Sequence, residues 1–343
     1  MTLRTPSPIR QLARESNFEL LRLVSQFCIV LYHIIHFYVV PFRASPWFEA
    51  VQMPLHVGVV VFVLLSGYFG IKPSSKGLFR LLSILLVYSL TNIIFGLRHG
   101  DGLYEKALAL CFLSRTPFWF VRTYVYLYLV SPILNDFLGR ASSKQKWYIL
   151  LALGFISVVI AQSRGDFTLE EGKNLGYFMF LYCLGQQLHE YKGAWQNWPT
   201  SKLLLAYLLF NIAIVSAYLL LPSLHAVTWK LCFYYTSPLL ITNAVLLFLL
   251  FGKIRLQSAG INWLATSCLA IFLIHCSVHA KQLLHLVGKS LCQHLGDDCL
   301  LFCATVVLAL LVVGASILID KLLTPVWLVS GRLGTALQKK LGF

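Results

Sequence analysis

Charged residues are scarce in this sequence. Only 12% of its 343 residues are Asp, Glu, Lys or Arg, whereas soluble globular domains carry about 25%. Hydrophobic residues account for 58% of the chain. They form blocks of about 20 residues, the length at which a helix crosses a hydrocarbon core about 30 Å thick. The composition excludes an ordinary soluble domain and predicts an integral membrane protein, an all-α polytopic helical bundle.

Long loops, internal repeats and nucleotide-binding signatures are also absent from the sequence. No stretch between the apolar blocks exceeds about 20 residues, which is too short for a soluble catalytic domain. No period of about 20 to 50 residues repeats, and the phosphate-binding pattern GxxxxGK[ST] does not occur, which argues against an ATP-driven pump. Any chemistry must therefore take place among the helices or at their ends.

Ten apolar blocks predict ten membrane-spanning helices with both termini in the cytoplasm. The blocks lie near residues 18–40, 54–71, 78–97, 118–138, 147–162, 174–189, 203–221, 230–251, 262–283 and 300–321. With a cytoplasmic N-terminus, the inner segments hold 17 of the 28 Lys and Arg residues and the outer segments hold nine. This is the bias expected of cytoplasmic loops. It accounts for the net charge of +15, so we expect membrane lipids rather than nucleic acid as partners.

The N-terminal region shows no targeting signal. Residues 1–17 are too polar for a signal-peptide core, and the apolar run that follows lacks a small-residue cleavage site. We therefore expect a cytoplasmic tail at 1–17, a single transmembrane domain at 18–330 and a second cytoplasmic tail at 331–343.

Most of the nine cysteines lie inside the predicted spans, where thiols pack as small apolar side chains. Cys292 and Cys299 differ because they share the last outer loop. A disulfide between them is compatible with an oxidising compartment, but their spacing alone does not decide whether it forms.

Two ionisable residues of the first predicted helix lie on one face. Arg22 and His33 are 11 residues apart, which brings them to within about 20° of each other around a helix and about 16 Å apart along it. Taken singly, Arg22 could be a cation that reaches the interface, and His33 could be hydrogen-bonded to a neighbouring helix. Together they favour a polar pocket that opens towards the cytoplasm, because charge at membrane depth is costly.

These two residues also match a known motif. The segment R-LVSQFCIVLY-H resembles the hallmark of the acyltransferase-3 group of membrane-bound acyltransferases, which modify cell-surface glycans. VVFVLLSGYFG (60–70), SCLAIFLIH (267–275) and FWFVRTYVYLYLVSPILN (118–135) resemble further segments of that family in the expected order. One departure is the segment KPSSKGLFR (72–80), where family members often carry paired arginines.

The resemblance implies an acyltransferase whose donor is an acyl-CoA, usually acetyl-CoA, bound from the cytoplasmic side. The implied acceptor is a sugar hydroxyl of a lipid-linked or periplasmic glycan. We therefore expect an O-acetyltransferase for a bacterial surface polysaccharide (O-antigen, capsule or exopolysaccharide) in the bacterial inner membrane. Acetyl-CoA is expected as a substrate, with no metal cofactor.

The residues fit these roles on chemical grounds. The anionic end of CoA suits Arg22 at the cytoplasmic mouth, with Lys76 and Arg80 on the same side as weaker candidates. At depth, the imidazole of His33 suits a general base that takes the proton of a sugar hydroxyl. It could instead carry the acyl group covalently; the sequence does not separate these roles.

The other candidates for the pocket or the acceptor site are His36, Ser66, Trp119, Arg122, Tyr126 and His275. Three of them also have a structural explanation. His36 could pack between helices, Ser66 beside Gly67 could allow close helix packing, and Trp119 could belong to an interfacial aromatic belt. His275 and His279 are four residues apart, but no carboxylate or cysteine pattern completes a metal site.

Two other functions remain open at this point. A transporter or flippase for a lipid-linked sugar could use intramembrane Arg and His residues to bind an anionic head group. Such proteins commonly contain repeats and broken helices, and no convincing repeat is present. The second is a non-catalytic relative that acts as a sensor or partner subunit. The presence of both Arg22 and His33 argues against this function.

Overall fold

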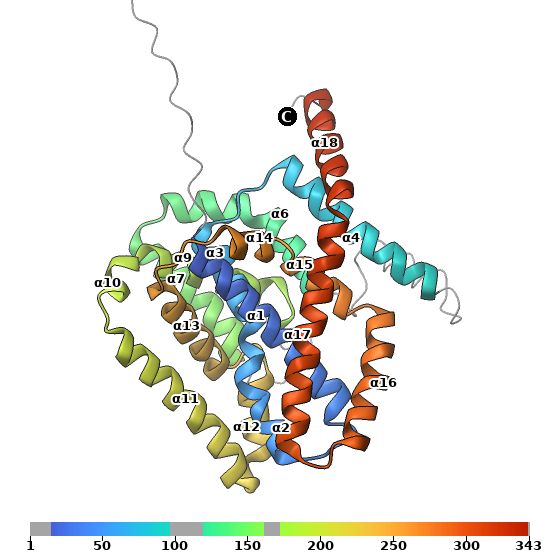
Figure 1. Ribbon diagram of the computed structural model, residues 1–343. Coiled ribbons are helices and arrows are strands. Elements are labelled where there is room, and N and C mark those ends of the chain that lie inside the picture. Colours follow the sequence, from blue (N-terminus) through green and yellow to red (C-terminus); the bar gives the residue numbers. More distant parts are fainter. Residues whose placement is uncertain (1–14, 97–118, 161–171, 342–343) are drawn as a thin grey trace, which may run out of the picture.

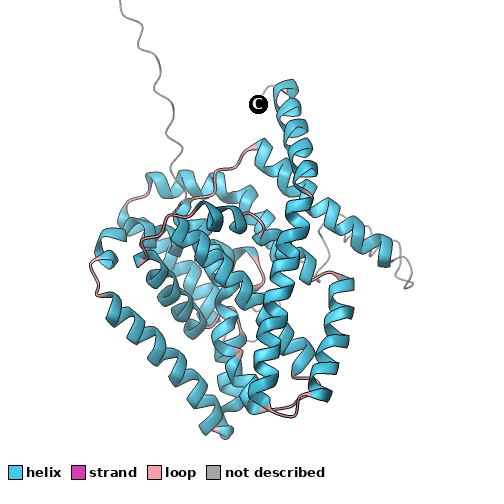
Figure 2. Ribbon diagram, in the orientation of Figure 1, coloured by secondary structure: helices cyan, strands magenta, loops and turns pink. Residues whose placement is uncertain are grey.

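The protein is helical throughout the part of the chain that its structure, a computed structural model, describes. The described residues are 15–96, 119–160 and 172–341, and every regular element in these ranges is a helix (Figure 2). The main helices are α1 (Ser16–Ile34), α2 (Pro46–Val51), α3 (Gly58–Phe69), α4 (Ser75–Gly96), α6 (Trp119–Arg140), α7 (Ser143–Gly154), α9 (Leu175–Glu190), α10 (Lys192–Gln196), α11 (Thr200–Leu220), α12 (His225–Phe233), α13 (Pro238–Lys253), α14 (Ala259–Ala265), α15 (Cys268–His275), α16 (Val278–His294), α17 (Asp298–Leu322) and α18 (Thr324–Leu341). Most of the predicted N-terminal tail lies outside the described residues.

Short helical turns of other types extend several of these helices. A π-helical turn at Ile35–Val39 continues α1, and another at Phe155–Ile160 continues α7. Turns of 3-10 helix lie at Met53–Val57, before α3, and at Pro222–Leu224, before α12. The turn after α7 matters for the membrane, because the 12 residues of α7 alone are short for a bilayer.

Several helical segments of the described ranges are long and apolar enough to cross a membrane. Five qualify singly: Ser16–Val39, Pro46–Phe69, Ser143–Ile160, Thr200–Leu220 and Asp298–Leu322. Two bent pairs of helices also qualify, which gives up to seven spans. The protein is thus a polytopic membrane bundle. The count of ten remains a prediction, because it includes elements such as α9, whose 16 residues are short for a bilayer.

Two of the spans expected as single helices are broken. The predicted span 230–251 is divided into α12 and α13, bent by 48°, and the predicted span 262–283 includes a bend of 76° between α15 and α16. A serine begins the new helix at each break. Ser237 accepts a hydrogen bond from the Leu239 N–H, and Ser277 accepts one from the Ala280 N–H. Such caps satisfy N–H groups that a helix start leaves free.

Helix α1 lies in the middle of the bundle (Figure 1). It packs against α3, α13, α14, α15 and α17, so its faces meet neighbours on several sides. Leu21, Val30 and Ile34 are completely buried in these contacts. A polar side chain on α1 is therefore held among protein helices rather than in lipid, which is the setting in which charge at membrane depth is tolerated.

Helices α3 and α9 approach each other closely through two glycines. A Cβ atom on Gly67 would lie 2.1 Å from the carbonyl oxygen of Tyr182, and one on Gly185 would lie 2.3 Å from that of Leu64. No side chain fits at these distances. The Ser66-Gly67 pair therefore has the packing function expected of small residues in membrane helices.

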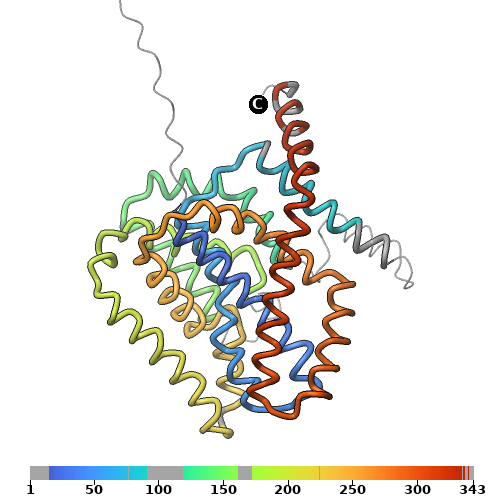
Figure 3. The backbone as a smooth tube through the Cα atoms, viewed as in Figure 1, coloured from blue at the N-terminus to red at the C-terminus, as the bar shows by residue number. Residues whose placement is uncertain are grey.

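The last described element of the chain, α18, is a long helix. Helix α18 follows α17 directly and packs against α4 (Figure 3). It begins at Thr324 and continues to Leu341, so most of the region 331–343, expected as a tail, is helical.

The sequence left open whether Cys292 and Cys299 form a disulfide, and in the structure both are free thiols. Cys292 directs its thiol towards the carbonyl oxygen of Val39, at 3.8 Å. The spacing of the two cysteines in the sequence does not predict that the Cys292 thiol points towards Val39.

Candidate active site

His33 forms a hydrogen-bonded pair with His275 of α15. Its Nδ1 atom lies 2.9 Å from Nε2 of His275, and Nδ1 of His275 lies 2.6 Å from the carbonyl oxygen of Ile271. A carbonyl oxygen only accepts, so Nδ1 of His275 carries a proton. In the neutral pair Nε2 of His275 is then the acceptor, and Nδ1 of His33 is the donor. This leaves Nε2 of His33 with its lone pair, ready to accept a proton.

The pair lines a cavity of about 200 Å³, which we call the histidine cavity. Its other polar lining residues are Tyr32, Tyr38, His56, Trp119, Tyr235, Cys276 and Lys281. Cys276 lies in the break between α15 and α16, and Lys281 belongs to α16. The bend between these helices therefore brings a cation and a thiol to the cavity that holds His33.

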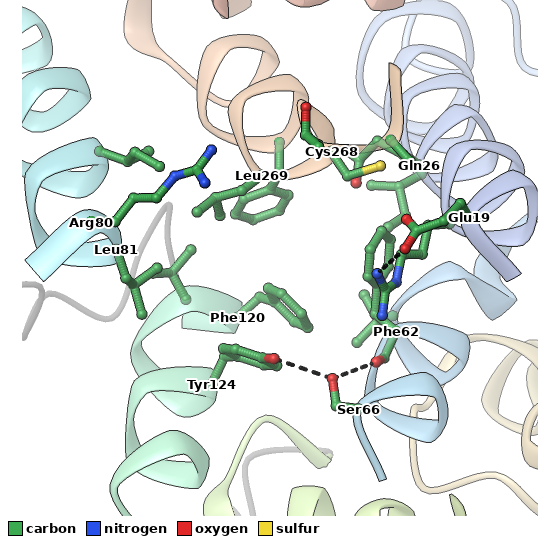
Figure 4. Close-up of a pocket in the computed structure, with 18 residues that line it drawn as sticks. Glu19, Gln26, Phe62, Ser66, Arg80, Leu81, Phe120, Tyr124, Cys268 and Leu269 are labelled. Carbon is green, nitrogen blue, oxygen red and sulfur yellow. Dashed lines mark hydrogen bonds and ion pairs between the residues drawn. The ribbon is translucent and has the colours of Figure 1, made fainter. Parts of the chain in front are cut away.

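A second cavity, of about 370 Å³, surrounds Arg22 and is called the arginine cavity (Figure 4). Glu19 accepts a hydrogen bond from Arg22 at 2.9 Å, within α1. Arg80 of α4 lies on the opposite side of the cavity (Figure 4). Arg22 is thus oriented by a carboxylate on the preceding turn, and Arg80 supplies the second guanidinium group.

Ser66 and Tyr124 add two hydroxyl groups to the arginine cavity. The Ser66 hydroxyl donates to the carbonyl oxygen of Phe62 at 2.9 Å. Its only hydrogen is therefore used, and the contact with the Tyr124 hydroxyl at 3.2 Å has tyrosine as donor (Figure 4). This arrangement fixes Ser66 and gives no base that would make it a nucleophile.

Gln26 is the residue of the arginine cavity that most needs a ligand. Its Nε2 atom is buried and has no hydrogen-bond partner among the described residues. Leaving such a donor unpaired costs about 1–3 kcal/mol. A polar ligand in the cavity, with a carbonyl oxygen to accept the hydrogen bond, would remove that cost.

The two cavities adjoin. Ile29, Val59 and Phe272 line both of them. Arg22, Gln26, Ile29 and His33 follow one another at helical spacing on α1, so one face of this helix runs along the whole path. The structure therefore places two adjacent cavities along α1, one lined by Arg22 and the other by His33.

Of the other predicted residues, four line the two cavities. Arg80 and Ser66 line the arginine cavity, and Trp119 and His275 line the histidine cavity. The side chain of Lys76 lies outside the described part of the structure. Counting Arg22 and His33, six of the ten predicted site residues therefore line the two cavities.

Three predicted residues lie elsewhere. His36 has its Nδ1 atom 3.0 Å from Oε1 of Gln52 and stacks on Tyr32, so it has the packing role considered for it. Tyr126 is exposed on α6, and Arg122 lines neither cavity. The helical period of α6 explains both, because Phe120, Val121 and Tyr124 form the face turned to the arginine cavity and Arg122 and Tyr126 lie on other faces.

The residues of the site that were not predicted include Gln26, His56, Cys276 and Lys281. The spacing of α1 contained a signal for Gln26, which is four residues after Arg22 and seven before His33. His56 and Lys281 reach the site only because the chain bends near them, and the apolar pattern of the sequence does not show those bends.

The atoms Nδ1 of His33, Nε2 of His275 and Sγ of Cys276 lie within 4.8 Å of one another, a grouping that could hold a metal ion. Two nitrogens on a tetrahedral zinc ion lie about 3.3 Å apart. The observed 2.9 Å between the rings is instead a hydrogen-bond distance. We therefore treat the pair as hydrogen-bonded, and the absence of a metal stays a prediction.

A comparison with protein families agrees with this geometry. The family model described as an acyltransferase domain, that of the acyltransferase-3 group, matches residues 15–320. The chain therefore belongs to this family, which confirms the resemblance seen in its motifs, and it is a multi-pass membrane acyltransferase. Comparisons with curated proteins and with solved structures gave no match.

Proposed function

We propose that the protein is an O-acetyltransferase of the bacterial inner membrane. It transfers an acetyl group from cytoplasmic acetyl-CoA to a hydroxyl group of a cell-surface polysaccharide (O-antigen, capsule or exopolysaccharide) or of its lipid-linked precursor. The observation that carries the proposal is the path between the two cavities, with Arg22 at one end and His33 at the other. This shape suits a donor that has an anionic end and a distant thioester.

The polar groups of the arginine cavity suit the donor. The guanidinium groups of Arg22 and Arg80 attract its phosphates, and the unpaired Nε2 of Gln26 suits an amide carbonyl of the pantetheine arm. The apolar residues between the cavities, Ile29 and Phe272, suit the thin arm itself. The thioester then lies beside His33.

The reaction follows from the free lone pair on Nε2 of His33. This atom takes the proton of the sugar hydroxyl as the oxygen attacks the thioester carbonyl carbon. The new C–O bond forms, the C–S bond breaks, and the CoA thiolate leaves. His33 then gives its proton to the thiolate, which restores the neutral imidazole.

Two neighbours assist this step. His275 accepts the hydrogen bond from Nδ1 of His33 and so keeps the proton off Nε2. Its role is the one that a carboxylate or carbonyl group has beside many catalytic histidines. The Lys281 ammonium group lines the same cavity and stabilises negative charge on the thioester oxygen during attack.

The proposal is tested by the amount of ester-linked acetate on surface glycans of cells that express wild-type protein or His33→Ala at equal membrane levels. We expect His33→Ala to lose about 10²- to 10⁴-fold of the activity, the usual contribution of a general base. His294→Ala is the matched control, because His294 is exposed at the end of α16. Equal acetylation in all three strains would refute the proposal.

A further inference from the structure

A third cavity, of about 760 Å³, lies at the C-terminal end of α17. It is bounded by residues of α4, α14, α17 and α18, helices that meet at the end of the bundle from which α18 extends (Figure 1). Arg80 and Thr266 line both this cavity and the arginine cavity. The third cavity therefore continues the path that leads from Arg22 to His33, and it lies at the end predicted to be cytoplasmic.

This cavity, which we call the basic cavity, is lined by four cations and one carboxylate. The cations are Arg80, Lys321, Arg332 and Lys339. The carboxylate is Asp320, and both of its oxygens are occupied: one accepts from the Ser267 hydroxyl at 2.7 Å and the other from the Trp327 indole at 3.1 Å. Asp320 is buried and held by these bonds, so it does not pair with the cations.

Three of the four cations are available to a ligand. Lys321 is engaged, because it donates to the carbonyl oxygen of Trp263 and to the Thr266 hydroxyl. Among the described residues, no hydrogen bond or ion pair involves Arg80, Arg332 or Lys339. Four cations against one carboxylate leave the cavity with an excess of positive charge, which favours an anionic ligand.

The spacing of the cations indicates more than one anionic group. Arg332 and Lys339 are seven residues apart on α18, two turns of one helix face and about 10 Å along it. Arg80 approaches from α4, on another side of the cavity. The exposed indole of Trp263, with the Lys321 ammonium 4.4 Å from its ring centre, adds an aromatic surface. Separated cations beside an aromatic ring suit a nucleotide with several phosphates.

We propose that the basic cavity binds the phosphorylated nucleotide end of the acyl-CoA donor, with Arg332 and Lys339 of α18 as phosphate-binding residues. The proposal rests on the proposed function, because it places the far end of the same donor. Both residues lie beyond position 320, where the family match ends, so family membership assigns them no role. The donor then extends from α18, past Arg80 and Arg22, to His33.

The test measures binding of radiolabelled acetyl-CoA to the purified full-length protein in detergent. We expect Arg332→Ala and Lys339→Ala each to weaken binding about tenfold, the loss of one charge-assisted hydrogen bond. Adenosine 3′,5′-bisphosphate should compete with acetyl-CoA on the wild type and lose this ability on the double variant. Pantetheine, which lacks the nucleotide, should compete equally well on both.

Two kinds of control accompany this experiment. Lys202→Ala removes the same charge from an exposed position at the start of α11 and should leave affinity unchanged. Arg332→Lys retains the charge and should recover part of the affinity. A shared thermal midpoint among the variants shows that α18 remains folded.

The contrary outcomes separate this inference from the proposed function. Wild-type protein that fails to bind acetyl-CoA overturns both. Wild-type binding that the α18 variants retain in full overturns only the position of the nucleotide. If the variants keep acetyl-CoA affinity but lose co-purifying phosphatidylglycerol, the basic cavity binds a lipid head group and the inference is also wrong.

Discussion

At the scale of single residues, the proposed chemistry depends on which ring nitrogen of His33 holds the proton. The spacing of Arg22 and His33 on one helix face predicted a polar path, because helix geometry alone relates them. The direction of the His33 lone pair depends on His275 and on the carbonyl group of Ile271, some 240 residues further along. No local pattern contains that information.

Replacement of His275 tests its positioning role. In His275→Ala, Nδ1 of His33 loses its acceptor, so the proton can move to Nε2 and remove the base. We expect kcat to fall about 10²-fold while affinity for acetyl-CoA stays unchanged. His275→Gln, which keeps an acceptor oxygen, should restore part of the rate. Parallel losses of kcat and donor affinity in both variants would indicate a role in folding instead.

At the scale of helices, composition predicted the class of fold but missed the breaks. Both broken segments are apolar throughout, and periodicity does not distinguish a continuous helix from two helices joined at an angle. The signals were single residues, Ser237 before Pro238 and Ser277. The second break matters most, because it brings Cys276 and Lys281 to the histidine cavity.

The close contact of α3 with α9 makes a prediction about stability. Gly67→Ala places a methyl group against the backbone of Tyr182, so the helices must separate; overpacking of this kind costs about 1–3 kcal/mol. Gly314→Ala in α17 is the matched control, since a Cβ atom there meets nothing within 4 Å. Thermal midpoints in detergent should fall for Gly67→Ala and not for Gly314→Ala. A midpoint unchanged in both would contradict the packing.

At the scale of the whole molecule, the order of the cavities agrees with the predicted orientation. The basic cavity involves α4 and α18, whose cations are on the predicted cytoplasmic side, and the histidine cavity lies deeper along α1. The sequence predicted this polarity from the distribution of Lys and Arg. It could not predict the basic cavity, because residues near positions 80, 263 and 339 meet only in the folded bundle.

The orientation can be tested with Cys299, an exposed free thiol at the start of α17. We expect a membrane-impermeant maleimide to label Cys299 in whole cells with a permeabilised outer membrane, because this end of α17 faces outward. The protein used for labelling carries Cys111→Ser and Cys303→Ser, so that Cys299 is the thiol under test, and the further change Cys299→Ser provides the unlabelled control. Labelling in inverted vesicles but not in cells would reverse the topology.

The central claim is that His33 is the general base for acetyl transfer from a donor bound on the cytoplasmic side. Its most direct test adds radiolabelled acetyl-CoA to the exposed cytoplasmic face of inverted membrane vesicles and measures label bound to glycan through an ester. The account predicts incorporation by wild-type protein and almost none by His33→Ala that still binds acetyl-CoA. Equal incorporation by the two proteins would contradict it.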